Sequence, residues 1–374
     1  MPADRTTTDR TTGRAAPGRT ATDRPTTDRA VTDPATTDRT PQDGTATTAA
    51  VDEHEADDRE FLDQADPYRR ELLAHCYRML GSIHDAEDLL QETYLRAWRS
   101  YERFEGRSSL RTWLYRIATN ACLTAIDQRG NRPMPSGLGA PSDEPERPVV
   151  ASPEVPWLEP APDAVVAADA ADPAAIVAAR ESTRLAFVAA LQHLPARQRV
   201  VLILRDVLKW RAAEVAELLG TSTAAVNSAL QRARERLEQD GPVRDELVEP
   251  TDPSARELLD RYAKAFEDAD IAALIELFKQ DAVWEMPPFP EWFVGAETIA
   301  RLIIAQCGPE PGELRMVPAA ANGQPAFGLY RRDEEGVHRP YHLQVVAVTA
   351  EGVAHVSAFF DTSLFPLFGL PESA

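Results

Sequence analysis

A stretch rich in proline and acidic residues, 131–177, interrupts the helical pattern of this 374-residue chain and has the composition of a linker. Strong helical periodicity fills residues 59–128 before this stretch and 178–238 after it. A second break, at Gly241 and Pro242, precedes the last third of the chain, where helical segments are followed by strand-like segments. The sequence therefore predicts two all-α domains at 57–130 and 178–240, a linker at 131–177, and a third domain at 250–370.

The first 56 residues consist mainly of Thr, Asp, Arg, Ala and Pro, with a loose Thr-Asp-Arg repeat and little to bury. We predict a disordered tail for residues 1–56. The first thirty residues contain no apolar segment typical of a secretion signal, and no run reaches the roughly 18 apolar residues that span a bilayer. Cys76, Cys122 and Cys307 lie far apart. A cytoplasmic protein without a disulfide framework or a zinc cluster is expected.

The net charge of -20 argues at first against nucleic acid, because Lys and Arg drive phosphate binding. The acidic excess, however, is concentrated in residues 134–179 and 241–374, whereas residues 180–240 carry +3. Residues 107–132 contain five arginines and one acid, Asp127. Each of the two helical segments therefore has a part that could bind DNA.

The first helical segment shows two apolar stripes separated by Gly81, which we expect to end a helix. One stripe comprises Leu72, Leu73, Cys76, Met79 and Leu80, and the other comprises Leu89, Leu90, Tyr94, Leu95 and Trp98.

Residues 211–237 have the pattern of a helix-turn-helix, with Gly220 in the turn and Ser222 as the N-cap of the second helix. Apolar residues recur on one side of that helix, and its other side is polar. An ordinary pair of helices with a solvated face is the alternative at this point. If the segment binds DNA, the residues facing the major groove are Ser222, Thr223, Ala225, Asn227, Ser228, Gln231, Arg232 and Arg234.

The last third of the chain has the sequence pattern of an α+β domain. Its pattern predicts helices at 255–268 and 271–280 and strands at 282–286, 326–331, 341–349 and 353–360.

Residues 85–98 resemble region 2.2 of the sigma-70 family, the helix that docks on the β′ clamp of RNA polymerase. The resemblance implies a core-polymerase surface made by Asp85, Asp88, Leu89, Gln91, Glu92 and Arg96. Residues 104–129 resemble regions 2.3 and 2.4, which open and read the -10 promoter element. The residues implied there are Arg107, Arg111, Trp113, Arg116, Asn120 and Arg129, with Tyr115 as a further candidate for stacking on a base.

The second helical segment resembles region 4 of the same family, because Leu194, Pro195, Arg197 and Arg199 precede an apolar run and the helix-turn-helix. Region 4 reads the -35 element and binds the β flap of the polymerase. A chain with only these two sigma domains resembles the extracytoplasmic-function group. In that group the linker is thought to thread the polymerase active-site channel, where the acidic residues of this linker would mimic the charge of nascent RNA.

Residues 253–369 resemble the SnoaL-like, ketosteroid-isomerase-like cone fold, which implies a small-molecule pocket. Its expected lining is Tyr262, Trp284, Met286, Trp292, His342 and Phe359. Tyr262 matches the oxyanion-hole tyrosine of the isomerases, but Met286 replaces their general base, and Glu285 should face the opposite side of the strand. No catalysis, cofactor or metal is therefore expected.

Together these features predict a sigma factor that binds core polymerase and both promoter elements and is modulated in cis by its third domain. In sigma factors with such an extension, the extension is thought to act on the sigma domains. The alternative is a helix-turn-helix regulator fused to a small-molecule-binding or isomerase-like domain. That alternative leaves residues 85–98 and 104–129 unexplained. An anti-sigma partner cannot be inferred from the sequence.

Overall fold

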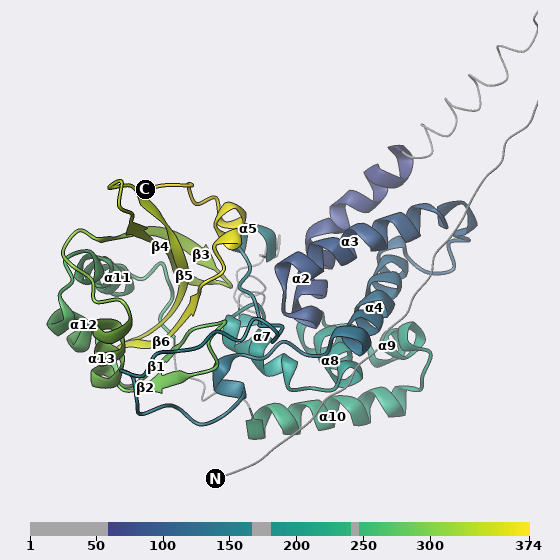
Figure 1. Cartoon of the computed structure of the whole chain (residues 1–374). Helices are drawn as coiled ribbons and strands as arrows, with labels where there is room; N and C mark the ends of the chain where they lie inside the picture. Colours follow the sequence, from purple (N-terminus) through teal and green to yellow (C-terminus); the bar gives the residue numbers. More distant parts are fainter. Residues whose placement is uncertain (1–58, 167–180, 241–246) are drawn as a thin grey trace, which may run out of the picture. The chain divides into compact units, whose positions relative to one another are not determined.

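The computed structural model describes residues 59–166, 181–240 and 247–374 (Figure 1). The predicted tail, residues 1–56, lies outside the described residues, as do 167–177 of the linker and 178–180 of the second helical domain. All described residues fall within one compact unit.

The first helical domain contains α2 (Arg69–Leu80), α3 (Ile83–Trp98) and α4 (Leu110–Arg129), with short helices η1 (Asp66–Tyr68) and η2 (Tyr101–Arg103). Gly81 ends α2 at φ 72, a left-handed conformation that glycine adopts without steric cost. The Oγ of Ser82 then accepts a hydrogen bond from the Asp85 amide and begins α3. The predicted helix boundary at Gly81 is confirmed.

The apolar stripe predicted on α3 is only partly buried. Leu89 and Leu90 are buried, but Leu95 is 52% exposed and Trp98 is 36% exposed. The buried face is completed by Thr93 and Ala97, because these two residues lie one and two turns beyond Leu90 on the same side of the helix. Leu95 and Trp98, which belong to the predicted apolar stripe, therefore lie at the surface.

The second helical domain contains α7 (Leu185–Gln192), α8 (Ala196–Leu202), the π-helical turn η4 (Ile203–Val207), α9 (Ala212–Leu219) and α10 (Thr223–Asp240). Gly220 ends α9 at φ 61. Val215 on α9 is buried, as are Val226 and Leu230 on α10, so the inner face of the helix-turn-helix is the predicted one. The linker contributes η3 (Pro135–Gly137) and α5 (Asp163–Val166).

The C-terminal domain has a mixed sheet in the order β2-β1-β6-β5-β4-β3, in which β1 and β6 are parallel and the other neighbours antiparallel. Helices α11, α12 and α13 lie together on one face of this sheet (Figure 1). The elements are α11 (Pro253–Glu267), α12 (Ile271–Leu277), β1 (Phe278–Glu285), β2 (Trp292–Val294), α13 (Ala296–Gln306), β3 (Leu314–Ala321), β4 (Gln324–Arg332), β5 (His338–Thr349), β6 (Gly352–Phe359) and η5 (Thr362–Phe368). The predicted combination of two all-α domains with an α+β cone domain is confirmed.

Four elements of the cone were not predicted, namely β2, α13, β3 and η5. The helix predicted over 271–280 ends at Leu277, because Phe278 already pairs with Val353 of β6. Residues 278–280 therefore belong to the sheet.

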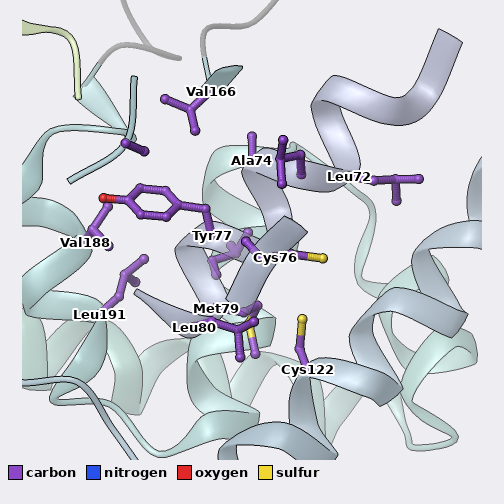
Figure 2. Packing of buried hydrophobic residues seen from close by; sticks show 14 of the residues in the cluster. Leu72, Ala74, Cys76, Tyr77, Met79, Leu80, Cys122, Val166, Val188 and Leu191 are labelled. Atoms are coloured by element: carbon purple, nitrogen blue, oxygen red, sulfur yellow. The ribbon is translucent and has the colours of Figure 1, made fainter. Parts of the chain in front are cut away.

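Side chains on the two faces of the sheet join different cores. The inner face packs with α11, α12 and α13 around Tyr262 and Trp284. The outer face, including Val345 and Phe359, joins a cluster that contains α2 and α7. Figure 2 shows the centre of that cluster, where Tyr77 and Met79 lie among side chains of several elements. Within the segments that the structure describes, no helix is long and apolar enough to cross a membrane.

Candidate nucleic-acid and protein interfaces

The outward side of α3 is a polar surface with an apolar centre. Asp88, Gln91, Glu92 and Arg96 are exposed, and Arg96 donates to Glu92 at 2.6 Å. Leu95 lies among them and was not foreseen as a surface residue. An exposed apolar residue within a polar rim is typical of a protein interface. Leu89 is 7% exposed and holds α3 on its own domain, so its inclusion among the surface residues was wrong.

Asp85, predicted to face a partner, is instead held by two arginines of its own domain and the linker. Arg129 Nη1 lies 2.5 Å from one carboxylate oxygen of Asp85, and Arg132 Nη2 lies 2.6 Å from the other. The Asp85 side chain is 16% exposed. These ion pairs use both oxygens and leave little of Asp85 available to a partner. They also engage Arg129, which was expected on the -10 surface.

Trp113, Arg116 and Asn120 share one side of α4, since they follow one another at helical spacing. Trp113 and Arg116 are partly exposed, and Asn120 is exposed. The ring of Phe104 packs on Trp113 with centroids 4.8 Å apart. Arg107, in the loop before α4, is 84% exposed and pairs with Glu105 at 2.5 Å. This side of α4 therefore presents cations and part of an indole ring to solvent.

Arg111 and Tyr115 do not belong to that surface. Arg111 donates two hydrogen bonds to Glu71, at 2.8 and 2.7 Å, and lies over the rings of Tyr115 and Trp210. Tyr115 is fully buried and contacts Trp210. Glu71 therefore takes two of the five N–H donors of Arg111, and Tyr115 has no exposed surface, so in this arrangement neither residue is presented beside Trp113 and Asn120.

The polar face of α10 is presented as the sequence predicted. Ser222 Oγ accepts from the Ala225 amide at 3.2 Å, which confirms the N-cap. Arg232 donates to Ser228 at 2.7 Å, and Arg234 donates twice to Asp206 of η4. All eight predicted residues are exposed, namely Ser222, Thr223, Ala225, Asn227, Ser228, Gln231, Arg232 and Arg234.

Two buried arginines tie the helical domains to each other. Arg199 of α8 is fully buried and donates to the Met79 carbonyl at the end of α2 and, at 2.8 Å, to Asn131 Oδ1. Arg78 of α2 donates to Ser182, just before α7, at 3.1 and 3.0 Å. Burial lowers the pKa of each guanidinium to about 10, so both remain charged at neutral pH.

The turn between β3 and β4 inserts Asn322 among three separate segments. Asn322 is fully buried, and its Oδ1 accepts from the linker amide of Ala161 at 2.8 Å. Its Nδ2 donates to Tyr77 Oη of α2 at 2.8 Å and to the Thr183 carbonyl at 2.7 Å. Gln324 accepts from the Leu185 amide, which begins α7. No sequence signal pointed to Asn322, because its partners lie far away in the chain.

Linker carboxylates are engaged by neighbouring segments. Glu159 accepts from Ser82 Oγ at 2.8 Å and pairs with His84 and Arg132. Glu146 is bidentate to Arg301 of α13, at 2.7 and 2.9 Å. Asp163 accepts from the Gly323 amide at 2.6 Å. In this arrangement the acids of the linker therefore bind the protein itself.

The predicted pocket residues divide between core, surface and the opposite face of the sheet. Tyr262 donates to Gln344 at 2.9 Å, and Gln344 contacts His342 at 2.9 Å. These residues, with Trp284 and Met286, are buried in the packed inner core. Trp292 is partly exposed and donates to the Gly139 carbonyl. Phe359 was assigned wrongly, because it lies in the outer-face cluster rather than with Tyr262.

Glu285 faces the outer side of the sheet, as predicted from strand alternation. It is 2% exposed and accepts from His355 Nε2 at 2.7 Å and from the Ser136 amide at 3.1 Å. Burial alone would raise the pKa of this carboxyl, but His355 and the Ser136 donors more than offset it, and the pKa is lowered. Glu285 is therefore ionised at neutral pH.

Two buried histidines should make stability depend on pH. Burial lowers the pKa of His342 to about 3, and burial with the nearby charge of Arg78 does the same for His75. In the unfolded chain both titrate near 6.5. The stability they contribute is therefore complete above about pH 6.5 and is lost as the pH falls toward 3, by roughly 1.4 kcal/mol per unit for each histidine.

We expect His342→Gln to remove about half of that loss while keeping an acceptor for Gln344 Nε2. The measurement is the free energy of urea unfolding at pH 7.5 and 5.5. The matched control is His338→Gln, at the first residue of β5. Equal pH slopes for the wild type and His342→Gln would show that His342 is not held neutral.

Three family models match the chain, each on one of the domains. Sigma-70 region 2 matches residues 65–132, Sigma-70, region 4 matches 184–237, and the SnoaL-like domain matches 259–361. A helix-turn-helix regulator with a ligand domain would not carry the first of these matches. The alternative reading of the sequence is therefore excluded.

Curated relatives match most of the length of the chain. The ECF RNA polymerase sigma factor SigG of Mycobacterium tuberculosis H37Rv is 58% identical over 322 residues, which cover 85% of this chain and 86% of that protein. SigJ of the same organism is 29% identical over 305 residues, covering 78% and 88%. The crystal structure of Mycobacterium tuberculosis SigJ matches 83% of this chain and 100% of that chain with a TM-score of 0.54 at 23% identity, which shows a shared fold.

Proposed function

This chain belongs to the extracytoplasmic-function group of the sigma-70 family of RNA polymerase sigma factors, and we propose that its C-terminal domain holds the two sigma domains in a closed, inactive state. The observation that carries the proposal is the insertion of Asn322 between α2, the linker and the entry to α7. Opening of this contact would then be a step in transcription initiation.

The distance between the two promoter elements supports the proposal that the described arrangement is a closed state, in which the protein is not bound to a promoter. By their positions, the -10 and -35 elements lie about 25 base pairs apart, roughly 85 Å of duplex at 3.4 Å per base pair. In the described arrangement Tyr115 of region 2 and Trp210 of region 4 are in ring contact at 5.1 Å. Two domains that touch cannot occupy both elements at once. Arg199 and Arg78 must therefore release their partners when the protein binds a promoter.

The linker has a double role in this proposal. In the closed state Glu146 and Glu159 pair with arginines of the C-terminal domain and the linker itself. After opening, the same carboxylates become available to the positively charged path through the polymerase. The acidic linker thus exchanges internal partners for external ones.

The residue-level assignments complete the proposal. Core polymerase binds α3 through its β′ clamp and region 4 through its β flap. Trp113, Arg116 and Asn120 meet the -10 element, and the exposed face of α10 meets the -35 element in the major groove. The protein acts in the cytoplasm with the polymerase. The C-terminal domain responds to a small molecule and performs no catalysis, because Met286 supplies no base where the isomerases hold a carboxylate.

Hydrogen exchange tests the closed state directly. The Ala161 and Leu185 amides donate to side chains of the C-terminal domain, at 2.8 and 3.1 Å, and should exchange slowly in the free protein. Adding core polymerase should speed their exchange severalfold. The Trp113 amide, bonded within α4, serves as the internal control and should not change. Unchanged protection of Ala161 and Leu185 in the polymerase complex would contradict the proposed opening.

A further inference from the structure

A cavity of about 1170 Å³ lies between the outer face of the cone sheet and the region 4 helices. One wall is formed by β5 and β6, and the other by α7 and the end of α10. Small residues face each other across it, including Ala186 and Ala189 on α7 and Ala347 and Ala354 on the sheet. The cavity is open to solvent, because its lining includes the exposed residues Glu181 and Glu238, and clefts of this size are where small molecules bind.

The cavity contains one polar corner that is prepared for a partner. His355 is 35% exposed, and its Nε2 lies 2.7 Å from the buried carboxylate of Glu285. The Glu285 carboxylate accepts from Nε2, which fixes the ring and leaves Nδ1 to form a hydrogen bond with another group. Ser357 Oγ, which also lines the cavity, is 3.4 Å from the same carboxylate. The corner therefore offers one hydrogen-bonding nitrogen on a fixed ring.

Charges in the lining are mostly neutralised by partners. Arg234 is bidentate to Asp206, at 2.8 and 2.6 Å, and Arg184 pairs with Glu181 at 2.7 Å. More than half of the lining side chains are apolar. An anion would meet more carboxylates than guanidiniums there, so the lining favours an uncharged molecule.

We propose that this cavity binds an uncharged, mainly apolar small molecule whose hydroxyl group forms a hydrogen bond with His355 Nδ1. The inference rests on the closed state, because the two walls face each other only there. The proposed ligand site therefore lies at the junction with region 4 and not among the predicted pocket residues, which are packed in the interior of the cone. A ligand bound between the walls stabilises the closed form by mass action.

The test uses 2-naphthol as the probe and 2-methylnaphthalene, which has no hydroxyl group, as its partner, with binding to the full chain measured by equilibrium dialysis. We expect 2-naphthol to bind about 2- to 10-fold more tightly, the effect of one hydrogen bond. Ala347→Trp and Ala186→Trp fill the cavity from opposite walls and should each weaken binding of both probes at least tenfold. Ala272→Trp, at an exposed position on α12, is the matched control and should bind normally. His355→Phe should abolish the preference for 2-naphthol.

The absence of 2-naphthol binding to the wild type, or unchanged binding in both cavity-filling variants, would overturn the inference. Slow exchange of the Ala161 amide in the same samples separates this failure from failure of the closed state. If the amide is protected and the probe does not bind, only the ligand site is wrong. Circular dichroism of His355→Phe identifies a folding defect, and in that case Ala186→Trp, on the wall opposite the Glu285–His355 pair, decides whether the cavity binds the probe.

Discussion

Asn322→Gly is expected to raise run-off transcription by reconstituted polymerase at least tenfold at limiting sigma concentration. The substitution removes a side chain that makes three hydrogen bonds, at 2.8, 2.8 and 2.7 Å. Each such bond contributes about 1 kcal/mol, so the closed state loses roughly 3 kcal/mol relative to the open one. Glycine keeps the backbone unstrained, because Asn322 has a φ of 57.

The matched control for Asn322→Gly is Glu335→Gly, in the exposed turn between β4 and β5. It makes the same kind of change in a hairpin of the same domain and should leave transcription unaltered. Tyr77→Phe provides an independent route, because it removes the hydroxyl that accepts from Asn322 and donates to the Glu159 carbonyl. If both Asn322→Gly and Tyr77→Phe fold normally and transcribe no better than the wild type, the C-terminal domain does not hold the sigma domains closed.

Leu95→Asp is expected to weaken binding to core polymerase by about 30-fold or more, the effect of losing an interface hot spot. Leu95 is 52% exposed on α3 and lies between polar residues that include Glu92 and Arg96. Because the side chain is already in water, the substitution should alter the melting temperature little. The measurement is the dissociation constant of the complex with core polymerase that lacks its own sigma factor.

Ile304→Asp controls for a general effect of removing surface apolar area. Ile304 is 53% exposed on α13 of the C-terminal domain. This variant should bind core polymerase as the wild type does. Equal affinities for Leu95→Asp and Ile304→Asp would place the polymerase surface elsewhere on the chain.

The helix-turn-helix was predictable because its information is local. The apolar spacing of Val226 and Leu230, the glycine at 220 and the cap at Ser222 all lie within a dozen residues. The same held for the turn at Gly81. In the cone domain, β3 was missed because its alanines and Pro318 lack the β-branched pattern of a strand.

The errors at the site share one physical cause, which is that partners distant in the sequence decide whether a polar side chain is free. Arg111 looked like a phosphate ligand until Glu71 and Trp210 were placed beside it. Asp85 looked exposed until Arg132, 47 positions away, was brought to it. Leu95 shows the reverse case, because periodicity alone cannot distinguish an exposed apolar residue from a core residue.

The position of Asn322 satisfies two unrelated requirements with one residue. The hairpin needs a backbone with positive φ, which Gly and Asn tolerate, while the contact needs an amide that both donates and accepts. Aspartate would lack the donor, and glycine would lack both groups. Because both requirements fall on one residue, a single substitution at position 322 would remove the proposed closed state and make the sigma activity constitutive. Control that depends on one residue is easily lost by a lineage once selection for it weakens.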